Sequence, residues 1–81
     1  MNIEIYTKPE CPFCIMAKQF LNAKNLQYTE KVLGVDIVFT EFVNKFQSTV
    51  PAILINDNII GGYDQMLLLY SVSPEVFDGG N

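Results

Sequence analysis

The chain has 81 residues, of which 49% are hydrophobic and 17% are charged, which suits one small domain with its own core. Nine carboxylates against five lysines, with no arginine or histidine, give a net charge of −4 and exclude nucleic acid, whose phosphates require clustered Lys and Arg. Since no apolar run approaches the roughly 20 residues of a membrane span and no signal segment begins the chain, we expect a soluble cytoplasmic protein.

Two elements are predicted near the start of the chain. Residues 2–6 predict a strand, because Ile3 and Ile5 alternate with polar residues ahead of a Lys-Pro break. The pattern becomes helical from Pro12, which suits a first helical position because no N–H is needed there. Four apolar residues at i, i+4, i+7 and i+8 predict the buried side of this helix: Phe13, Ala17, Phe20 and Leu21.

The middle of the chain predicts a second strand and a second helix. Apolar and polar residues alternate over residues 27–32, and Gly34 then permits a turn. The apolar residues that follow recur at helical spacing and predict a helix whose broad apolar face packs against a sheet. They are Val35, Val38, Phe39, Phe42, Val43 and Phe46.

A hairpin is predicted next. Thr49-Val50-Pro51 ends the second helix, and residues 52–55 form a strand. Turn-forming residues at 56–58 then lead into a short return strand at residues 59–60.

The last predicted element is a helix. Gly61-Gly62 stops the return strand, and Asp64 is predicted to cap a helix that ends before Ser73-Pro74. The order is therefore β-α-β-α-β-β-α in a single domain spanning residues 1–81. We expect residues 78–81 to fray.

Both cysteines of the chain, Cys11 and Cys14, lie at the start of the first predicted helix. Cys11 takes the N-cap position, where backbone N–H groups and the helix dipole favour a thiolate. With Pro12 and Lys8 nearby, we expect the thiol pKa to fall from about 8.5 into the range of roughly 3.5–7.5 found at activated sites. We predict redox chemistry and no metal, because structural zinc needs four ligands; half of a zinc site and two inert thiols are the alternatives.

Three motifs together resemble the glutaredoxin family over nearly the whole chain. They are Tyr6-Thr7-Lys8 leading into Cys11-Pro12-Phe13-Cys14, then Thr49-Val50-Pro51, then Gly61-Gly62-Tyr63-Asp64. The resemblance implies an α/β thioredoxin-like fold, with three helices packed on a four-stranded mixed sheet of order 2-1-3-4. It also implies reduction of protein disulfides and glutathione mixed disulfides, with Cys11 as nucleophile, Cys14 as resolving thiol and glutathione as co-substrate. No tightly bound cofactor is implied.

The resemblance further implies how glutathione is held. Val50–Pro51 would be a cis peptide bond beside the active cysteine, where the Val50 backbone pairs with the cysteinyl part of glutathione. The N–H groups of Tyr63 and Asp64 would bind the γ-glutamyl carboxylate, and the Asp64 side chain would bind its ammonium. The implied glutathione-binding residues are Lys8, Phe13, Gln47, Thr49, Val50, Pro51, Gly62, Tyr63 and Asp64.

Two positions depart from the common family pattern. Gln47 lies near where many members carry a basic residue for the glycyl carboxylate, which leaves Lys8 as the expected anchor. Phe13 replaces a frequent tyrosine, and its ring offers either an apolar wall of the site or a core side chain.

Two other functions compete with this interpretation. One is a thioredoxin-like carrier that is reduced by a reductase and has no glutathione site; the glycine motif argues against it. The other is a protein that holds an iron–sulfur cluster with glutathione, which Pro12 disfavours because such members carry Cys-Gly-Phe-Ser. The implied partners are glutathione and disulfide-containing or glutathionylated proteins, with ribonucleotide reductase as one candidate, and we expect a monomer.

Overall fold

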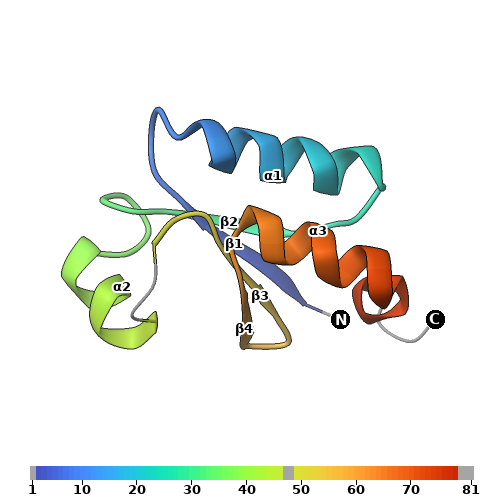
Figure 1. The fold of residues 1–81 in the computed structure, drawn as a ribbon. Coiled ribbons are helices and arrows are strands. Elements are labelled where there is room, and N and C mark those ends of the chain that lie inside the picture. Colours follow the sequence, from blue (N-terminus) through green and yellow to red (C-terminus); the bar gives the residue numbers. More distant parts are fainter. Residues whose placement is uncertain (1, 47–48, 79–81) are drawn as a thin grey trace.

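The computed structural model describes residues 2–46 and 49–78 (Figure 1). Within these ranges the predicted order of strands and helices is confirmed, and a short 3-10 helix, η1, follows. The elements are β1 (Ile3–Thr7), α1 (Pro12–Ala23), β2 (Thr29–Val32), α2 (Phe39–Phe46), β3 (Ala52–Ile55), β4 (Asn58–Gly61), α3 (Tyr63–Val72) and η1 (Pro74–Asp78).

The strands form one mixed sheet in the predicted order β2-β1-β3-β4. β1 runs parallel to β2, because α1 carries the chain back across the sheet between them. β1 pairs antiparallel with β3, and β3 with β4. Ile5 lies opposite Ile53 at the centre of the sheet, and both side chains are fully buried.

Alternate residues of the central strands point to opposite faces of this sheet. On the face that α1 and α3 cover, called here the α1/α3 face, the buried cluster comprises Ile3, Ile5, Ala17, Leu21, Ile53, Ile55, Met66 and Phe77. On the other face, called here the α2 face, the buried cluster comprises Tyr6, Leu33, Phe42, Ala52 and Leu54. The two faces therefore have separate cores, and the sheet lies between them.

The buried side of α1 differs from the predicted one. Cys14, Ala17 and Leu21 are buried, whereas Phe13 is 56% exposed. Of the four residues at helical spacing, Phe13 is therefore not a core side chain. Cys14 takes the place above the sheet, because it lies on the same side of the helix as Ala17 and Leu21 at i, i+3 and i+7.

The second helix is shorter and less buried than predicted. Residues 33–38 form a turn, in which Gly34 has a φ of 86° and the Asp36 carboxylate accepts a hydrogen bond from the Val32 N–H at 2.8 Å. α2 therefore begins only at Phe39, and Phe42 is its one fully buried residue. The predicted broad buried face is wrong, because four of the six apolar residues stay exposed: Val35, Val38, Phe39 and Val43.

The predicted hairpin is confirmed, and the start of the last helix is corrected. Asn56 and Asp57 have φ values of 51° and 69°, the left-handed pair that a tight β3–β4 turn requires. Gly62, not Asp64, is the N-cap residue of α3, because the helix begins two residues earlier than predicted. Asp64 lies inside the first turn, where its negative charge still suits the helix dipole.

The C-terminal segment closes the α1/α3 core. Phe77 of η1 is buried, and its ring lies 5.3 Å from Tyr70, which in turn meets Phe20 of α1 at 5.2 Å. Residues 79–81, part of the segment expected to fray, lie outside the described residues.

Candidate functional site

The cysteine pair occupies the junction of β1 and α1. Cys11 and Cys14 form a disulfide, with Cα atoms 5.2 Å apart. Cys11 is the predicted N-cap residue of α1, and Pro12 takes the first helical position. The Cys14 backbone N–H donates a hydrogen bond to the Cys11 Sγ at 3.2 Å. Both cysteines are buried, with Cys11 at 6% exposure and Cys14 at 1%, so Cys11 is the more accessible residue.

This geometry suits a Cys11 thiolate. A hydrogen bond from a backbone N–H stabilises the charged form of an acceptor, and the dipole of α1 adds to the effect at its N-terminus. The arrangement follows from the local sequence, because proline at the first helical position leaves the helix start directly after Cys11.

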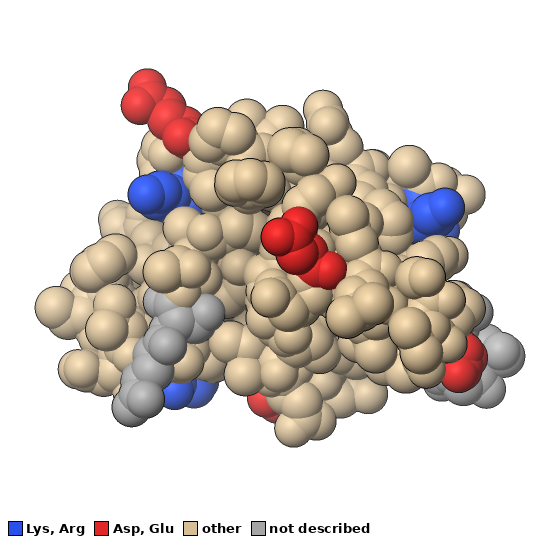
Figure 2. Space-filling view, in the orientation of Figure 1, with Lys and Arg blue, Asp and Glu red and all other residues tan. Residues whose placement is uncertain are grey.

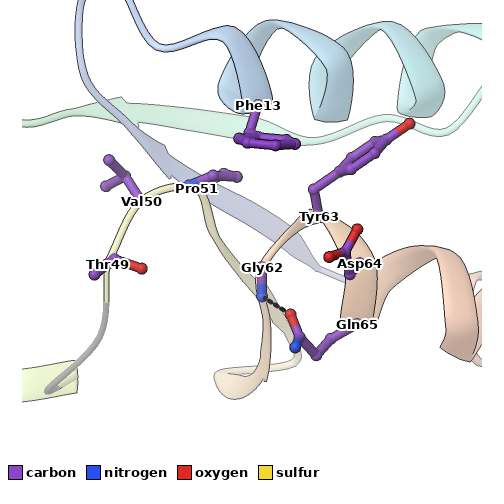
Figure 3. A pocket seen from close by; sticks show the side chains of 8 residues that line it. All are labelled: Phe13, Thr49, Val50, Pro51, Gly62, Tyr63, Asp64 and Gln65. Atoms are coloured by element: carbon purple, nitrogen blue, oxygen red, sulfur yellow. Dashed lines mark hydrogen bonds between the residues drawn. The ribbon is translucent and has the colours of Figure 1, made fainter.

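A cavity of about 180 Å³ lies next to the first turn of α1 (Figure 3). Seven residues that line it, all but Phe13, come from the 49–51 loop and the start of α3 or the glycine before it. The lining residues are Phe13, Thr49, Val50, Pro51, Gly62, Tyr63, Asp64 and Gln65. The structure thus brings together residues from all three sequence motifs, and the predicted cis bond between Val50 and Pro51 is confirmed.

The start of α3 forms one wall of this first cavity. The Gly62 N–H donates to the Gln65 Oε1 at 2.9 Å, as the dashed line in Figure 3 marks. The next N–H groups, those of Tyr63 and Asp64, have no partner within the helix because they belong to its first turn. A Cβ at Gly62 would lie 3.4 Å from the Pro51 carbonyl oxygen, so the start of α3 and the 49–51 loop are neighbours here.

Gln65 is a site residue that the sequence analysis missed. Its side-chain carbonyl oxygen accepts a hydrogen bond from the Gly62 N–H, whereas the N–H groups of Tyr63 and Asp64 have no partner within the helix. A glutamine three positions after an N-cap residue is one half of a capping box, and that spacing is the signal that identifies it.

Phe13 and Tyr63 lie next to each other in the wall of the first cavity (Figure 3). Their ring centroids are 6.1 Å apart in a tilted arrangement, which connects the first turn of α1 with the first turn of α3. Of the two places expected for Phe13, the structure gives the wall of the site.

A second cavity, of about 190 Å³, lies on the other side of the 49–50 backbone. It is lined by Lys8, Leu33, Phe39, Phe42, Thr49 and Val50. Lys8 is exposed and forms no ion pair within the described residues. Leu33, Phe39 and Phe42 were not predicted as site residues: Phe39 and Phe42 were assigned to the buried face of a helix, and Leu33 was assigned to no element. Gln47 lies outside the described residues.

A polar cluster lies below the cysteine loop. Thr7, at the end of β1, is 2% exposed, and its hydroxyl donates to the Glu30 Oε2 at 2.7 Å. Lys18 of α1 donates to the same oxygen at 3.0 Å. These two contacts, the Thr7 hydrogen bond first, hold the pKa of the Glu30 carboxyl below its usual value. The cluster connects α1 with both parallel strands.

Two further properties concern the described part of the chain. It contains no group of three or more Cys, Asp or Glu side chains placed to hold a metal ion. None of its helices is long and apolar enough to cross a bilayer.

The sequence of this chain is similar to those of known proteins. A family model described as Glutaredoxin matches residues 3–60. The chain is 37% identical over 70 residues to glutaredoxin 3 of Escherichia coli K12, which covers 84% of both chains. It is 45% identical over 67 residues to the hybrid peroxiredoxin hyPrx5 of Haemophilus influenzae, which covers 80% of this chain. The matched region is only 27% of that protein's length.

Solved structures share the fold. The glutaredoxin from Brucella melitensis superimposes with a TM-score of 0.79 at 25% identity, over 100% of this chain and 92% of that one. The glutaredoxin of the buckwheat glutaredoxin–glutathione complex gives a TM-score of 0.84 at 18% identity, over 96% of this chain and 77% of that one. The expected thioredoxin-like fold is therefore confirmed.

Proposed function

This chain belongs to the glutaredoxin family, and we propose that it is a glutathione-dependent thiol–disulfide oxidoreductase. Cys11 is the nucleophile and Cys14 the resolving thiol. One observation carries this assignment: the Cys11 sulfur caps α1 and accepts a hydrogen bond from the Cys14 N–H, next to the first cavity. The greater burial of Cys14 supports its secondary role.

Glutathione mixed disulfides are reduced in two steps. The Cys11 thiolate attacks the glutathione sulfur, the Cys11–glutathione disulfide forms, and the substrate leaves as a thiolate that takes a proton from solvent. A second glutathione thiolate then attacks the sulfur of the bound glutathione. Oxidised glutathione leaves, and Cys11 returns to the thiolate that the start of α1 stabilises.

Protein disulfides use both cysteines. Cys11 attacks one sulfur of the substrate and releases the other as a thiol, and Cys14, deprotonated, then attacks Cys11 to release the second. This route ends with a Cys11–Cys14 disulfide, and the pairing of these two cysteines in the structure supports it. Two glutathione molecules reduce it and leave as one oxidised glutathione.

The first cavity holds the γ-glutamyl group in this proposal. The N–H groups of Tyr63 and Asp64 bind its carboxylate, and the Asp64 side chain binds its ammonium. The backbone of Val50, in the cis arrangement with Pro51, pairs with the cysteinyl part. Phe13 supplies an apolar wall.

In this proposal the second cavity holds the other end of glutathione. Lys8 lines this cavity and binds the glycyl carboxylate. Gln47 is assigned to the same carboxylate, as a neutral partner. Thr49 and Gly62 complete the binding set as parts of the first cavity's wall.

Two cysteine variants test the mechanism in a coupled assay with glutathione and a small glutathionylated substrate. Cys11→Ser is expected to lower turnover by roughly a thousandfold or more, because the nucleophile is removed. Cys14→Ser is expected to keep this reaction and to lose most reduction of protein disulfides. Full activity of a folded Cys11→Ser protein in both reactions would refute the proposal.

A third variant tests the glutathione site itself. Asp64→Ala is expected to raise the apparent KM for glutathione by about tenfold with a smaller change in kcat, because one charge-assisted contact is lost. Glu75→Ala in η1 is the matched control, since it removes an exposed carboxylate that lines neither of these two cavities. An unchanged KM in Asp64→Ala would remove Asp64 from the binding site.

We propose a peroxiredoxin as one electron acceptor, because the similarity to hyPrx5 is 45% identity over a part of that hybrid protein. Ribonucleotide reductase, implied by the family resemblance, is the other candidate. The test compares the rates at which this protein, reduced beforehand, reduces the oxidised peroxiredoxin and the oxidised ribonucleotide reductase. The faster reaction identifies the preferred acceptor. We place this activity in the cytoplasm, where glutathione keeps the pair reducible.

The surface that meets a protein acceptor is poor in charge. Figure 2 shows mostly uncharged atoms on the face that carries α1 and α3, with only a few acidic and lysine side chains. Near the cysteines, Phe13, Ile15 and Met16 of α1 are exposed by 56%, 50% and 40%. Apolar contact at this surface therefore supports binding of protein disulfides.

A further inference from the structure

The second cavity has more apolar wall than glutathione needs. We propose that it selects protein substrates by the residue that follows their reactive cysteine, and that it favours a branched apolar side chain there. This inference rests on the proposed function, because it takes the position of the substrate cysteine from it.

Charge sets the direction of a peptide across the site. The two cavities meet at Thr49 and Val50, which line both. Asp64 is the charged residue of the first cavity and Lys8 that of the second. A γ-glutamyl-cysteinyl tripeptide with its cysteine at Val50 therefore has its ammonium end towards Asp64 and its carboxyl end towards Lys8, and we expect a protein segment paired with the same Val50 backbone to run in the same direction. The residue after the cysteine then lies over the second cavity.

The walls of the second cavity suit an apolar side chain. Leu33 and Phe42 are 8% and 1% exposed, so they form a fixed floor on the α2 face. Phe39 is 63% exposed and forms the outer wall. An apolar group in this position leaves no polar atom unpaired, whereas a polar side chain would lose water without gaining a partner from these three residues.

Glycine leaves most of this space unused. The cavity has about 190 Å³, whereas one water occupies about 30 Å³, and a glycyl residue places no side chain in it. In a closed apolar pocket an added apolar group changes specificity by roughly 10–200-fold. Because Phe39 leaves one side open to solvent, we expect about tenfold, at the lower end of that range.

The test uses mixed disulfides of γ-glutamyl-cysteinyl-X tripeptides with one common thiol, cysteamine. X is glycine, serine or leucine, so the ammonium, both carboxylates and the reacting sulfur stay the same. Glutathione regenerates the enzyme in every reaction, and kcat/KM for the mixed disulfide is measured. We expect leucine to exceed glycine by about tenfold and serine to stay within about twofold of glycine.

Two alanine variants locate the effect. Phe39→Ala removes the outer wall and is expected to bring the leucine-to-glycine ratio close to one. Leu68→Ala is the matched control, because Leu68 is 66% exposed on α3 and lines neither of the two cavities. Its ratio is expected to equal that of the unchanged protein.

The outcomes separate this inference from the function on which it rests. A ratio near one in the unchanged protein, with normal turnover of the glycine substrate, overturns the inference and leaves the proposed function standing. A ratio that Phe39→Ala does not lower also overturns it, because the preference then arises elsewhere. No turnover of any tripeptide disulfide would overturn both.

Discussion

α1 and α3 cover one face of the sheet, whereas α2 alone covers the other and lies apart from them (Figure 1). On the α1/α3 face the buried residues are sealed by a further ring of partly buried apolar side chains and by η1. On the α2 face, Val38, Phe39 and Val43 remain exposed. Similar helical patterns thus give a closed core on one face and an open apolar wall on the other, and the open wall borders the second cavity.

The largest effect is expected when a core side chain of the α1/α3 face is shortened. Leu21→Ala removes a fully buried side chain of α1 from the α1/α3 core. We expect the free energy of unfolding to fall by about 3 kcal/mol, because the lost burial and the new cavity add together. Urea denaturation measures it. A loss below about 1 kcal/mol would contradict this expectation. It would mean that the α1/α3 core collapses around the space left by the shortened side chain.

A smaller effect is expected from the polar cluster on the α1/α3 side. The pKa of Glu30 is lowered in the folded protein, chiefly by the Thr7 hydrogen bond, so this group stabilises the fold above its unfolded pKa. That stability is lost as pH falls through the folded pKa. Because the Glu30 side chain is 31% exposed, we expect a contribution of about 1 kcal/mol or less.

Two variants measure this contribution by urea denaturation between neutral and acid pH. Glu30→Gln is expected to make the acid loss of stability shallower, because the titrating group is gone. Thr7→Val is expected to raise the pKa of Glu30 towards its usual value, as an NMR titration of its carboxyl reports. Glu75→Gln is the control, and identical acid profiles for Glu30→Gln and the unchanged protein would contradict the assignment.

The smallest effect is expected on the α2 face, where the substitution is expected to raise the free energy of unfolding. Val38 directly precedes α2, and its carbonyl accepts the first helical hydrogen bond, from the Phe42 N–H at 3.0 Å. Val38→Ser would supply a capping hydroxyl, with Glu41 in place to complete a capping box. We expect a gain of about 0.5 kcal/mol by thermal or urea unfolding.

Val38→Ala is the comparison for that variant, since it removes the side chain without adding a cap. If the free energy of unfolding rises in Val38→Ser and not in Val38→Ala, the gain comes from the added cap. The α2 face is then not optimised for stability. A loss of more than about 1 kcal/mol in either variant would instead show that Val38 is covered by other residues.

The sequence predicted the fold and most of the first cavity, because strand alternation, the hairpin turn and three separated motifs are strong local signals. It failed where burial depends on neighbours. Periodicity shows that apolar residues share one side of a helix, but not whether a sheet covers that side, as Val43 demonstrates. The apolar wall of the second cavity was missed for a related reason, since Leu33 and Phe39 line the same cavity only because a turn forms at residues 33–38.

The unequal exposure of the two cysteines has a practical consequence for labelling. Cys11 is 6% exposed and Cys14 is 1% exposed, so an alkylating reagent added after reduction reaches Cys11 first. Brief treatment therefore gives one adduct at a defined position, and a fluorophore or resin attaches at the mouth of the site. Because Cys14 is the only other cysteine of the chain, no cysteine has to be added or removed to attach a label at Cys11.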